Sequence, residues 1–367
     1  MAVGGRIGNR SNRQRRNRSV IQRLIIIAAF IAATSPGKAA IYDLPPEGQD
    51  VIGAISTVVA SYEDTLVDIA RRHGLGYQDI VRANPGVNVW LPGEGTEVIL
   101  PNRFILPPGP RTGLVLNLAE YRMYYFPEPK EGEPAKVHTY PMSIGRMDWE
   151  TPLGRTQIVA MARNPAWYPP QSVRDEHAAD GDPLPRIVEP GPDNPLGTRA
   201  LRLGIPGYLI HGTNRPAGVG MRVSHGCIRM FPEDVEFLFD RIAVKTSVRI
   251  IDVPVKMGWD GDELIAEVHQ LLETPQRLPE ETAEHIETLD ADVELPELES
   301  FSKDPLTHVT EQFIAATAEK AGQLDWDVIE ALVARSDGIP ESVGIIIQTV
   351  NVDTTDIKNA ATSAAFE

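Results

Sequence analysis

Short hydrophobic runs, broken by Gly and Pro, dominate the chain from residue 112 to 253. The runs 114–118 and 122–126 are separated by a short turn, which predicts a β-hairpin. Further strands are expected at 137–144, 154–162, 200–203, 208–210 and 248–251. Several short strands with this punctuation are typical of a β-sandwich. The pattern therefore predicts a mainly β domain over 112–253.

Two other features belong to this domain. Pro232 opens a predicted helix, and Val235, Leu238 and Phe239 fall on one of its faces. The segment from Asn164 to Thr198 carries eight prolines and no strong periodicity. A loop this long inside a compact domain is usually functional, so we predict that it forms a lid over a site.

A smaller α+β unit is predicted at 61–101, after a linker at 40–60. A helix capped at Asp64-Thr65 ends at Gly74, and a second helix runs from Tyr77 to Asn84-Pro85. A strand at 96–100 closes the unit. The sequence therefore places a small module before the β domain.

The chain beyond Trp259 becomes acidic. Nine Asp and Glu residues lie between 280 and 299 with few aromatic residues, as in a solvated or disordered linker. Residues 306–320 and 324–333 show weak helical periodicity. We therefore expect 254–367 to be an acidic C-terminal extension, partly helical or disordered.

The N-terminus has the three parts of an export signal. Seven arginines precede the apolar run Leu24–Ala33, and Gly37-Lys38-Ala39 offers a cleavage site. A basic arm before a short buried helix is the alternative. Loss of a signal peptide at 1–39 would take the net charge from −16 to −24, since eight basic and no acidic residues are removed. We expect an acidic periplasmic protein, and this charge argues against nucleic acid as a partner.

The chain has one cysteine, Cys227. Exported proteins usually pair their cysteines in disulfides, so an odd cysteine suggests a reactive thiol. An inert buried cysteine is the alternative reading.

The surroundings of Cys227 favour the reactive thiol. The predicted strand 208–210 delivers His211 to the end of a sheet, and the Gly-rich turn 218–220 allows Cys227 to return to it. A nearby imidazole can lower a thiol pKa from about 8.5 and produce the attacking thiolate. Gly226 lets the N–H groups of residues 226 and 227 approach a developing oxyanion, each worth about 2.7–4 kcal/mol in comparable sites.

The motif His-Gly-Thr at 211–213 with Ser-His-Gly-Cys-Ile-Arg at 224–229 resembles the catalytic domain of the YkuD-type L,D-transpeptidases. The similarity runs from about 112 to 253 and includes Thr151-Pro152-Leu153-Gly154. Carried over by position, it implies the following roles: Cys227 as nucleophile, His211 as proton donor and acceptor, the Gly212 carbonyl as the group that orients the imidazole, and Ser224, His225, Gly226 and Arg229 as oxyanion or substrate-binding residues.

The resemblance also implies a reaction. Cys227 would attack a peptidoglycan tetrapeptide stem, release D-Ala and form a thioester, which an amine resolves to a 3→3 crosslink or an attached lipoprotein. It implies no cofactor and no metal, although a zinc site from His211, His225 and Cys227 is an alternative. A thiol hydrolase and a non-catalytic glycan-binding wall scaffold remain the other readings.

The unit 61–101 resembles a LysM domain, in Asp64-Thr65-Leu66, Ala83-Asn84-Pro85 and 98–101. That resemblance implies binding to glycans that contain N-acetylglucosamine; a structural spacer is the alternative. On this reading, deletion of 61–101 should weaken binding to insoluble wall and leave the chemistry on soluble fragments intact.

Overall fold

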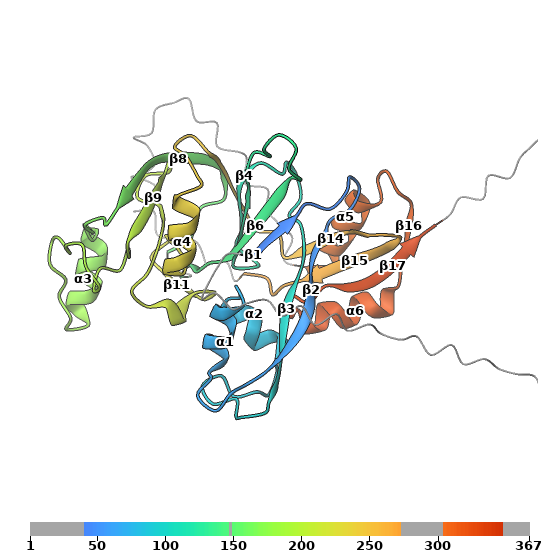
Figure 1. The fold of residues 1–367 in the computed structure, drawn as a ribbon, viewed down its shortest axis with the longest axis horizontal. Coiled ribbons are helices and arrows are strands. Elements are labelled where there is room, and N and C mark those ends of the chain that lie inside the picture. The colour runs from blue at the N-terminus through green and yellow to red at the C-terminus, as the bar shows by residue number, and fades with distance from the viewer. Residues whose placement is uncertain (1–39, 147–148, 273–303, 348–367) are drawn as a thin grey trace, which may run out of the picture. The chain divides into compact units, whose positions relative to one another are not determined.

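The computed structural model describes residues 40–146, 149–272 and 304–347 (Figure 1). The predicted signal peptide and the acidic run 280–299 lie outside these ranges. Within them, no helix combines the length and the hydropathy needed to cross a bilayer.

The predicted β domain is built on one nine-stranded sheet. Its strands, in spatial order, are β1 (Ala40–Asp43), β6 (Lys136–Pro141), β5 (Arg122–Phe126), β4 (Gly113–Asn117), β13 (Ser247–Ile251), β8 (Gly154–Arg163), β9 (Arg199–Leu203), β10 (Leu209–His211) and β12 (Ile228–Arg229). Neighbours are antiparallel except for the parallel pairs β4–β13 and β10–β12. The predicted strands are confirmed; the run 137–144 divides into β6 and β7 (Ile144–Gly145), which pairs with β11 (Arg222–Ser224).

The predicted sandwich of two sheets is wrong in its architecture. The sheet is continuous and curls, so that distant strands share one core (Figure 1). Leu116 and Met123 from one part and Leu201 and Ile228 from the other belong to the same buried cluster. The predicted helix α4 (Pro232–Phe239) is confirmed and packs into it. An alternation of apolar and polar residues along a strand indicates that one face of the sheet is buried. It does not indicate how the sheet curls.

Residues 40–60 are not a linker. They form β1 at the edge of the large sheet and β2 (Val51–Val59), which pairs with β3 (Glu97–Ile105) over its whole length. Most of β2 is exposed or half-buried, so it lacks the alternation that marks a strand. Between these strands lie α1 (Leu66–Arg72) and α2 (Tyr77–Ala83). We call residues 51–105 the βααβ module.

The βααβ module packs on the outer face of the large sheet. Leu66, Ile69 and Ile80 share a core with Val115 and Tyr124 of β4 and β5. Arg122 of β5 is 1% exposed. Its guanidinium donates to Asp79 of α2 at 2.6 Å and lies 4.1 Å from the centre of the Phe104 ring. The module is therefore not a separate body on a flexible tether.

The C-terminal extension contains a folded unit. The two predicted helices are confirmed as α5 (Pro305–Ala316) and α6 (Trp326–Arg335). They pack on an unpredicted four-stranded sheet of β14 (Val255–Asp260), β15 (Glu263–Val268), β17 (Glu341–Ile346) and β16 (Gly322–Leu324). The β14–β15 turn holds Gly261 at φ +64°, and this Asp-Gly signal was present in the sequence. Residues 254–272 and 304–347 therefore form an α+β unit, and the prediction of a partly helical or disordered extension missed its sheet.

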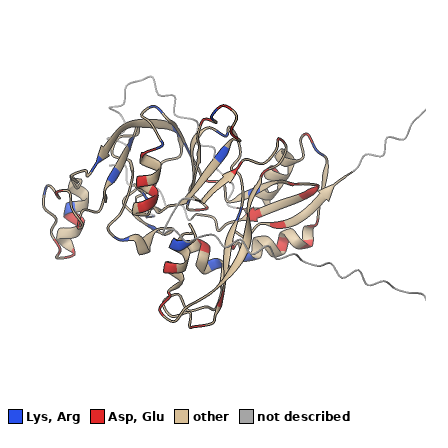
Figure 2. Ribbon diagram, in the orientation of Figure 1, with Lys and Arg blue, Asp and Glu red and all other residues tan. Residues whose placement is uncertain are grey.

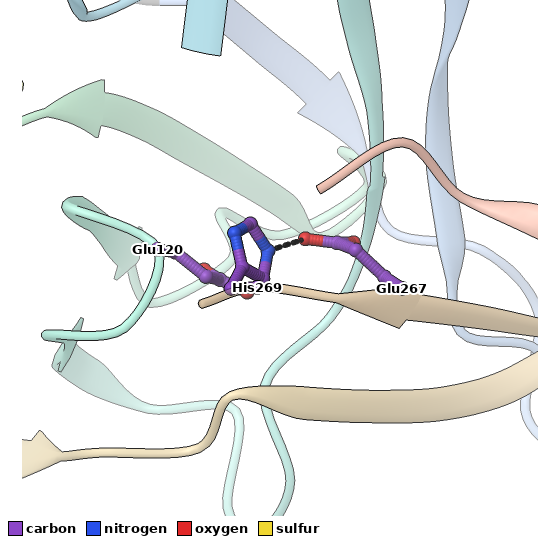
Figure 3. Close-up of side chains that lie close together, drawn as sticks. All are labelled: Glu120, Glu267 and His269. Atoms are coloured by element: carbon purple, nitrogen blue, oxygen red, sulfur yellow. Dashed lines mark hydrogen bonds and ion pairs between the residues drawn. The ribbon is translucent and has the colours of Figure 1, made fainter. Parts of the chain in front are cut away.

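A buried ionic cluster joins this unit to the rest of the fold, and Figure 3 shows three of its side chains, Glu120, Glu267 and His269. Lys256 of β14 forms ion pairs with Glu120, in the β4–β5 turn, and with Glu267 of β15 at 3.2 Å. Glu267 accepts hydrogen bonds from the Ile105 N–H at 2.9 Å and from His269 Nε2 at 2.6 Å. All three charged side chains are at most 2% exposed. Figure 2 marks further acidic residues on α3 (Gln171–Ala179), α4 and α6, and of these Asp234 of α4 is also buried, at 3% exposure.

Candidate active site

The parallel pair β10–β12 sets the two predicted catalytic residues on neighbouring strands. β10 ends at His211, and Cys227 immediately precedes β12. Ile210 pairs with Ile228, and both side chains enter the core. Because side chains alternate along a strand, His211, Cys227 and Arg229 belong to the opposite face. Strand pairing therefore places two residues that are distant in sequence on one side of the sheet edge.

His211 is held in a defined tautomer. Its Nδ1 lies 2.6 Å from the Gly212 carbonyl oxygen, which can only accept, so Nδ1 carries the proton and Nε2 has a free lone pair. The ring is 3% exposed. Burial, and then the charge of Arg229, lower the pKa of His211 to about 3, although the Gly212 carbonyl acts in the opposite direction. His211 is therefore a neutral imidazole that can accept a proton.

Cys227 is partly exposed, and its Sγ lies 3.6 Å from the Gly207 carbonyl oxygen. Burial raises the pKa of the Cys227 thiol, and a backbone hydrogen bond at Leu209 and the charge of Arg229 offset this only in part. This direction is opposite to the lowering expected from a neighbouring imidazole. The reason is that neutral His211 supplies no charge to stabilise a thiolate. The resting pair is therefore a thiol and an imidazole, without net charge.

The turn that carries Cys227 requires a glycine at 226. Gly226 has φ +91°, and a Cβ there would lie 2.8 Å from Cε1 of Tyr208. Its carbonyl accepts from Thr151 Oγ1 at 2.8 Å. Ser224 is 1% exposed, and its hydroxyl donates to the Cys227 carbonyl at 2.5 Å. The donor hydrogen of the Ser224 hydroxyl is therefore used within the turn that carries Cys227.

The side chain of His225 turns toward the predicted lid. Its Nε2 lies 2.9 Å from Oε2 of Glu176, and its ring packs edge-on against Trp149. Glu176 lies on α3, within the lid segment 164–198, and also pairs with Arg146 at 2.8 Å. The Nε2 atom of His225 is therefore engaged with the predicted lid segment. The sequence did not reveal Glu176, because one acidic residue in a proline-rich loop carries no motif.

Arg229 provides positive charge on the face of the catalytic pair. Its backbone pairs with Ser143, N to O at 3.2 Å and O to N at 2.8 Å. Its side-chain Nε is buried and, among the described residues, has no hydrogen-bond partner. Burial lowers the pKa of this guanidinium, and the charges of Arg215 and Arg146 act in the same direction. An unsatisfied buried donor on a cation is suited to an anionic ligand group.

The arrangement does not favour the zinc alternative. Across the described ranges, the one group of potential ligand atoms within 4.8 Å of one another is formed by Glu120, Glu267 and His269 (Figure 3). There the ammonium of Lys256 already supplies the cation.

Comparisons with known proteins agree with this geometry. Residues 111–250 match the sequence model of the YkuD family, described as an L,D-transpeptidase catalytic domain. The chain is 36% identical over 325 residues to a probable L,D-transpeptidase, ErfK/SrfK, of Salmonella typhimurium, covering 87% of this chain and 94% of that protein. It is 39% identical over 264 residues to YcfS of Escherichia coli, covering 69% of this chain and 81% of the relative. Escherichia coli YbiS is 38% identical over 253 residues, or 68% of this chain and 81% of its own length. Both of these relatives are also described as probable L,D-transpeptidases.

Proposed function

This chain belongs to the YkuD family of L,D-transpeptidases, acyltransferases that act on peptidoglycan stems, and we propose that it works through a thioester on Cys227. The observation that carries the proposal is the β10–β12 pairing, which sets a neutral imidazole and a partly exposed thiol on one face.

The first half-reaction is acylation of Cys227. Its sulfur attacks the carbonyl carbon of the amide before the terminal D-Ala of a tetrapeptide stem, while the thiol proton passes to Nε2 of His211. The backbone N–H groups of Gly226 and Cys227 stabilise the oxyanion. The C–N bond then breaks, His211 returns the proton to the departing amine, and D-Ala leaves a thioester behind.

The second half-reaction transfers the acyl group. An acceptor amine attacks the thioester carbonyl, His211 takes one proton from this amine, and the C–S bond breaks to restore the thiol. The product is a new amide: a 3→3 crosslink where the amine belongs to a second stem, or a wall-anchored lipoprotein where it belongs to a protein lysine.

Arg229 fits the carboxylate of the stem. Its Nε is buried without a hydrogen-bond partner in the described part of the chain, and it lies on the face of Cys227. A substrate carboxylate bound there would satisfy this donor. It would also oppose the positive charge that helps to depress the pKa of His211, and so strengthen the base.

The decisive experiment is product analysis with the purified mature chain and tetrapeptide muropeptides. Mass spectrometry should show release of D-Ala and a dimer joined by a 3→3 bond. Cys227→Ala should form neither product, and turnover by that variant would end the assignment of the nucleophile. Meropenem should add one molecule to the native chain and none to Cys227→Ala. A trimmed stem without dimer would instead support the thiol hydrolase.

The βααβ module is proposed to bind wall glycan. Tyr62 is 75% exposed and Trp90 is 61% exposed, and flat aromatic surfaces of this kind stack on sugar rings. Tyr62→Ala and Trp90→Ala should weaken pelleting with intact sacculi and spare turnover of soluble stems. Unchanged pelleting in both variants would leave the module without a glycan-binding role.

The proposed site of action is the periplasm, with residues 1–39 as a cleaved signal. N-terminal sequencing of the protein recovered from a periplasmic extract should begin near residue 40. An intact N-terminus in the cytoplasmic fraction would contradict export.

A further inference from the structure

The loop between the two proposed catalytic residues is in direct contact with the βααβ module. This loop, residues 212–226, contains the 3₁₀ turn Pro216–Gly218. The N–H groups of Tyr77 and Gln78 donate to the carbonyls of Val219 and Gly220 at 2.9 and 3.4 Å. N–H groups in the first turn of a helix have no partner within the helix. In α2, two of them are therefore satisfied by the active-site loop.

The two backbones meet at a pair of glycines. A Cβ built on Gly76 would lie 2.9 Å from the Cα of Gly220, and one built on Gly220 would lie 2.4 Å from the Tyr77 nitrogen. No side chain fits between the segments. Gly76 has φ −90°, which any residue adopts, so the requirement for glycine there comes from the contact alone.

The module also contacts the chain segment that follows Cys227. Arg71 of α1 forms a two-pronged ion pair with Glu233, both contacts at 2.7 Å. Glu233 lies in the first turn of α4, which begins three residues after Arg229. The module thus contacts the chain both before Cys227, at Val219, and after it, at Glu233.

We propose that the βααβ module positions Cys227 and is an integral part of the transpeptidase active site. The inference rests on the proposed function, because it concerns the placement of the proposed nucleophile. The β11–β7 pair and the Ser143 hydroxyl, which donates to the Gly218 carbonyl at 2.7 Å, anchor other parts of the loop. The α2 terminus adds the backbone contacts at Val219 and Gly220. A displacement of a reacting group by about 1 Å can slow catalysis about a hundredfold.

Tyr77→Pro tests the contact with little change to the helix. Proline is favoured at the first position of a helix, and Gly76 already has the extended backbone required before it. The substitution removes the N–H group of residue 77, which donates to the Val219 carbonyl. The proline ring then occupies the space of that N–H group. Tyr77→Ala is the matched control, because it removes the same side chain and keeps the N–H.

The assays are turnover of a soluble, glycan-free tetrapeptide stem and alkylation by iodoacetamide. The chain has a single cysteine, so alkylation reports Cys227 alone. Tyr77→Pro should lower kcat at least about tenfold, because a displacement of Cys227 by about 1 Å would slow catalysis by this much or more. KM should stay within about threefold of the native value, and the pH profile of alkylation should change. Tyr77→Ala should match the native chain. Equal kcat and alkylation in the two variants would overturn the proposal.

A second pair covers the case in which Tyr77→Pro fails to fold. Gly76→Ala collides with the loop, whereas Gly218→Ala, in the loop itself, meets only Val223 at 3.7 Å. Loss of kcat and altered alkylation in the first variant alone supports positioning, and identical behaviour of the two refutes it. If the native chain shows no turnover, the proposed function fails, while the alkylation comparison still decides the positioning.

Discussion

Replacement of Lys256 by Met should destabilise the protein by about 3–5 kcal/mol at pH 8, the usual range when one partner of a buried ion pair is removed. Lys256, Glu120 and Glu267 are all at most 2% exposed, so no water replaces the lost ammonium. Methionine keeps most of the aliphatic stem, so the packing loss is small beside the electrostatic one. Total stabilities of domains are about 5–15 kcal/mol, so this loss is easily measured.

The loss should depend on pH in a defined direction. Burial alone would raise the pKa of Glu267, but Lys256, His269 and the Ile105 N–H outweigh it and lower that pKa. In the native protein this group therefore stabilises the fold above its ordinary pKa, and the contribution is lost as pH falls through the lowered value. Without Lys256, burial should raise the pKa of Glu267, so the variant regains stability as this carboxylate takes up a proton.

The assay is urea unfolding of the native chain and Lys256→Met at pH 8 and pH 5. It can be followed by tryptophan fluorescence, to which Trp259, 3% exposed in the core of the C-terminal unit, contributes. The difference in stability should be smaller at pH 5. Lys136→Met is the control: its ion pair with Asp43 at 3.4 Å is open to solvent, so the change should stay within about 1 kcal/mol. A Lys256→Met protein as stable as the control at pH 8, or a difference that grows toward pH 5, would refute the reasoning.

Three further predictions concern catalysis. Deletion of residues 51–105 should abolish turnover of soluble stems as well as wall binding, contrary to the expectation from the LysM resemblance, because the module contacts the loop before Cys227; full soluble activity in the truncated chain would show that the module is dispensable. Acylation by meropenem should show no inflection near pH 6.5, since the pKa of His211 is about 3; stopped-flow rates that fall through pH 6.5 would instead indicate an imidazole of ordinary basicity. Gly226→Ala should lower kcat about a hundredfold or more, because both φ +91° and the contact with Tyr208 exclude a Cβ; near-native kcat in a correctly folded variant would contradict the geometry of the turn.

The sequence alone determined the features that depend on neighbouring residues. Apolar runs bounded by Gly and Pro located β4, β5, β8 and β9, and Pro232 with its apolar face located α4. The predicted catalytic motif could be identified for the same reason, because the proposed reaction requires particular residue types at fixed short spacings. The Asp-Gly turn of β14–β15 was equally local and was missed.

Only the tertiary structure decided the features that depend on distant segments. The pairing of β2 with β3 and the curl of the large sheet bring together residues that no local pattern relates. Lys256 and Glu267 appear in the sequence as ordinary charged residues, and only packing removes them from water. The same holds for the Cys227 thiol, whose raised pKa reflects how much solvent the folded chain excludes. A periodicity records which residue types recur, whereas burial and electrostatics are set by what the rest of the chain places around them.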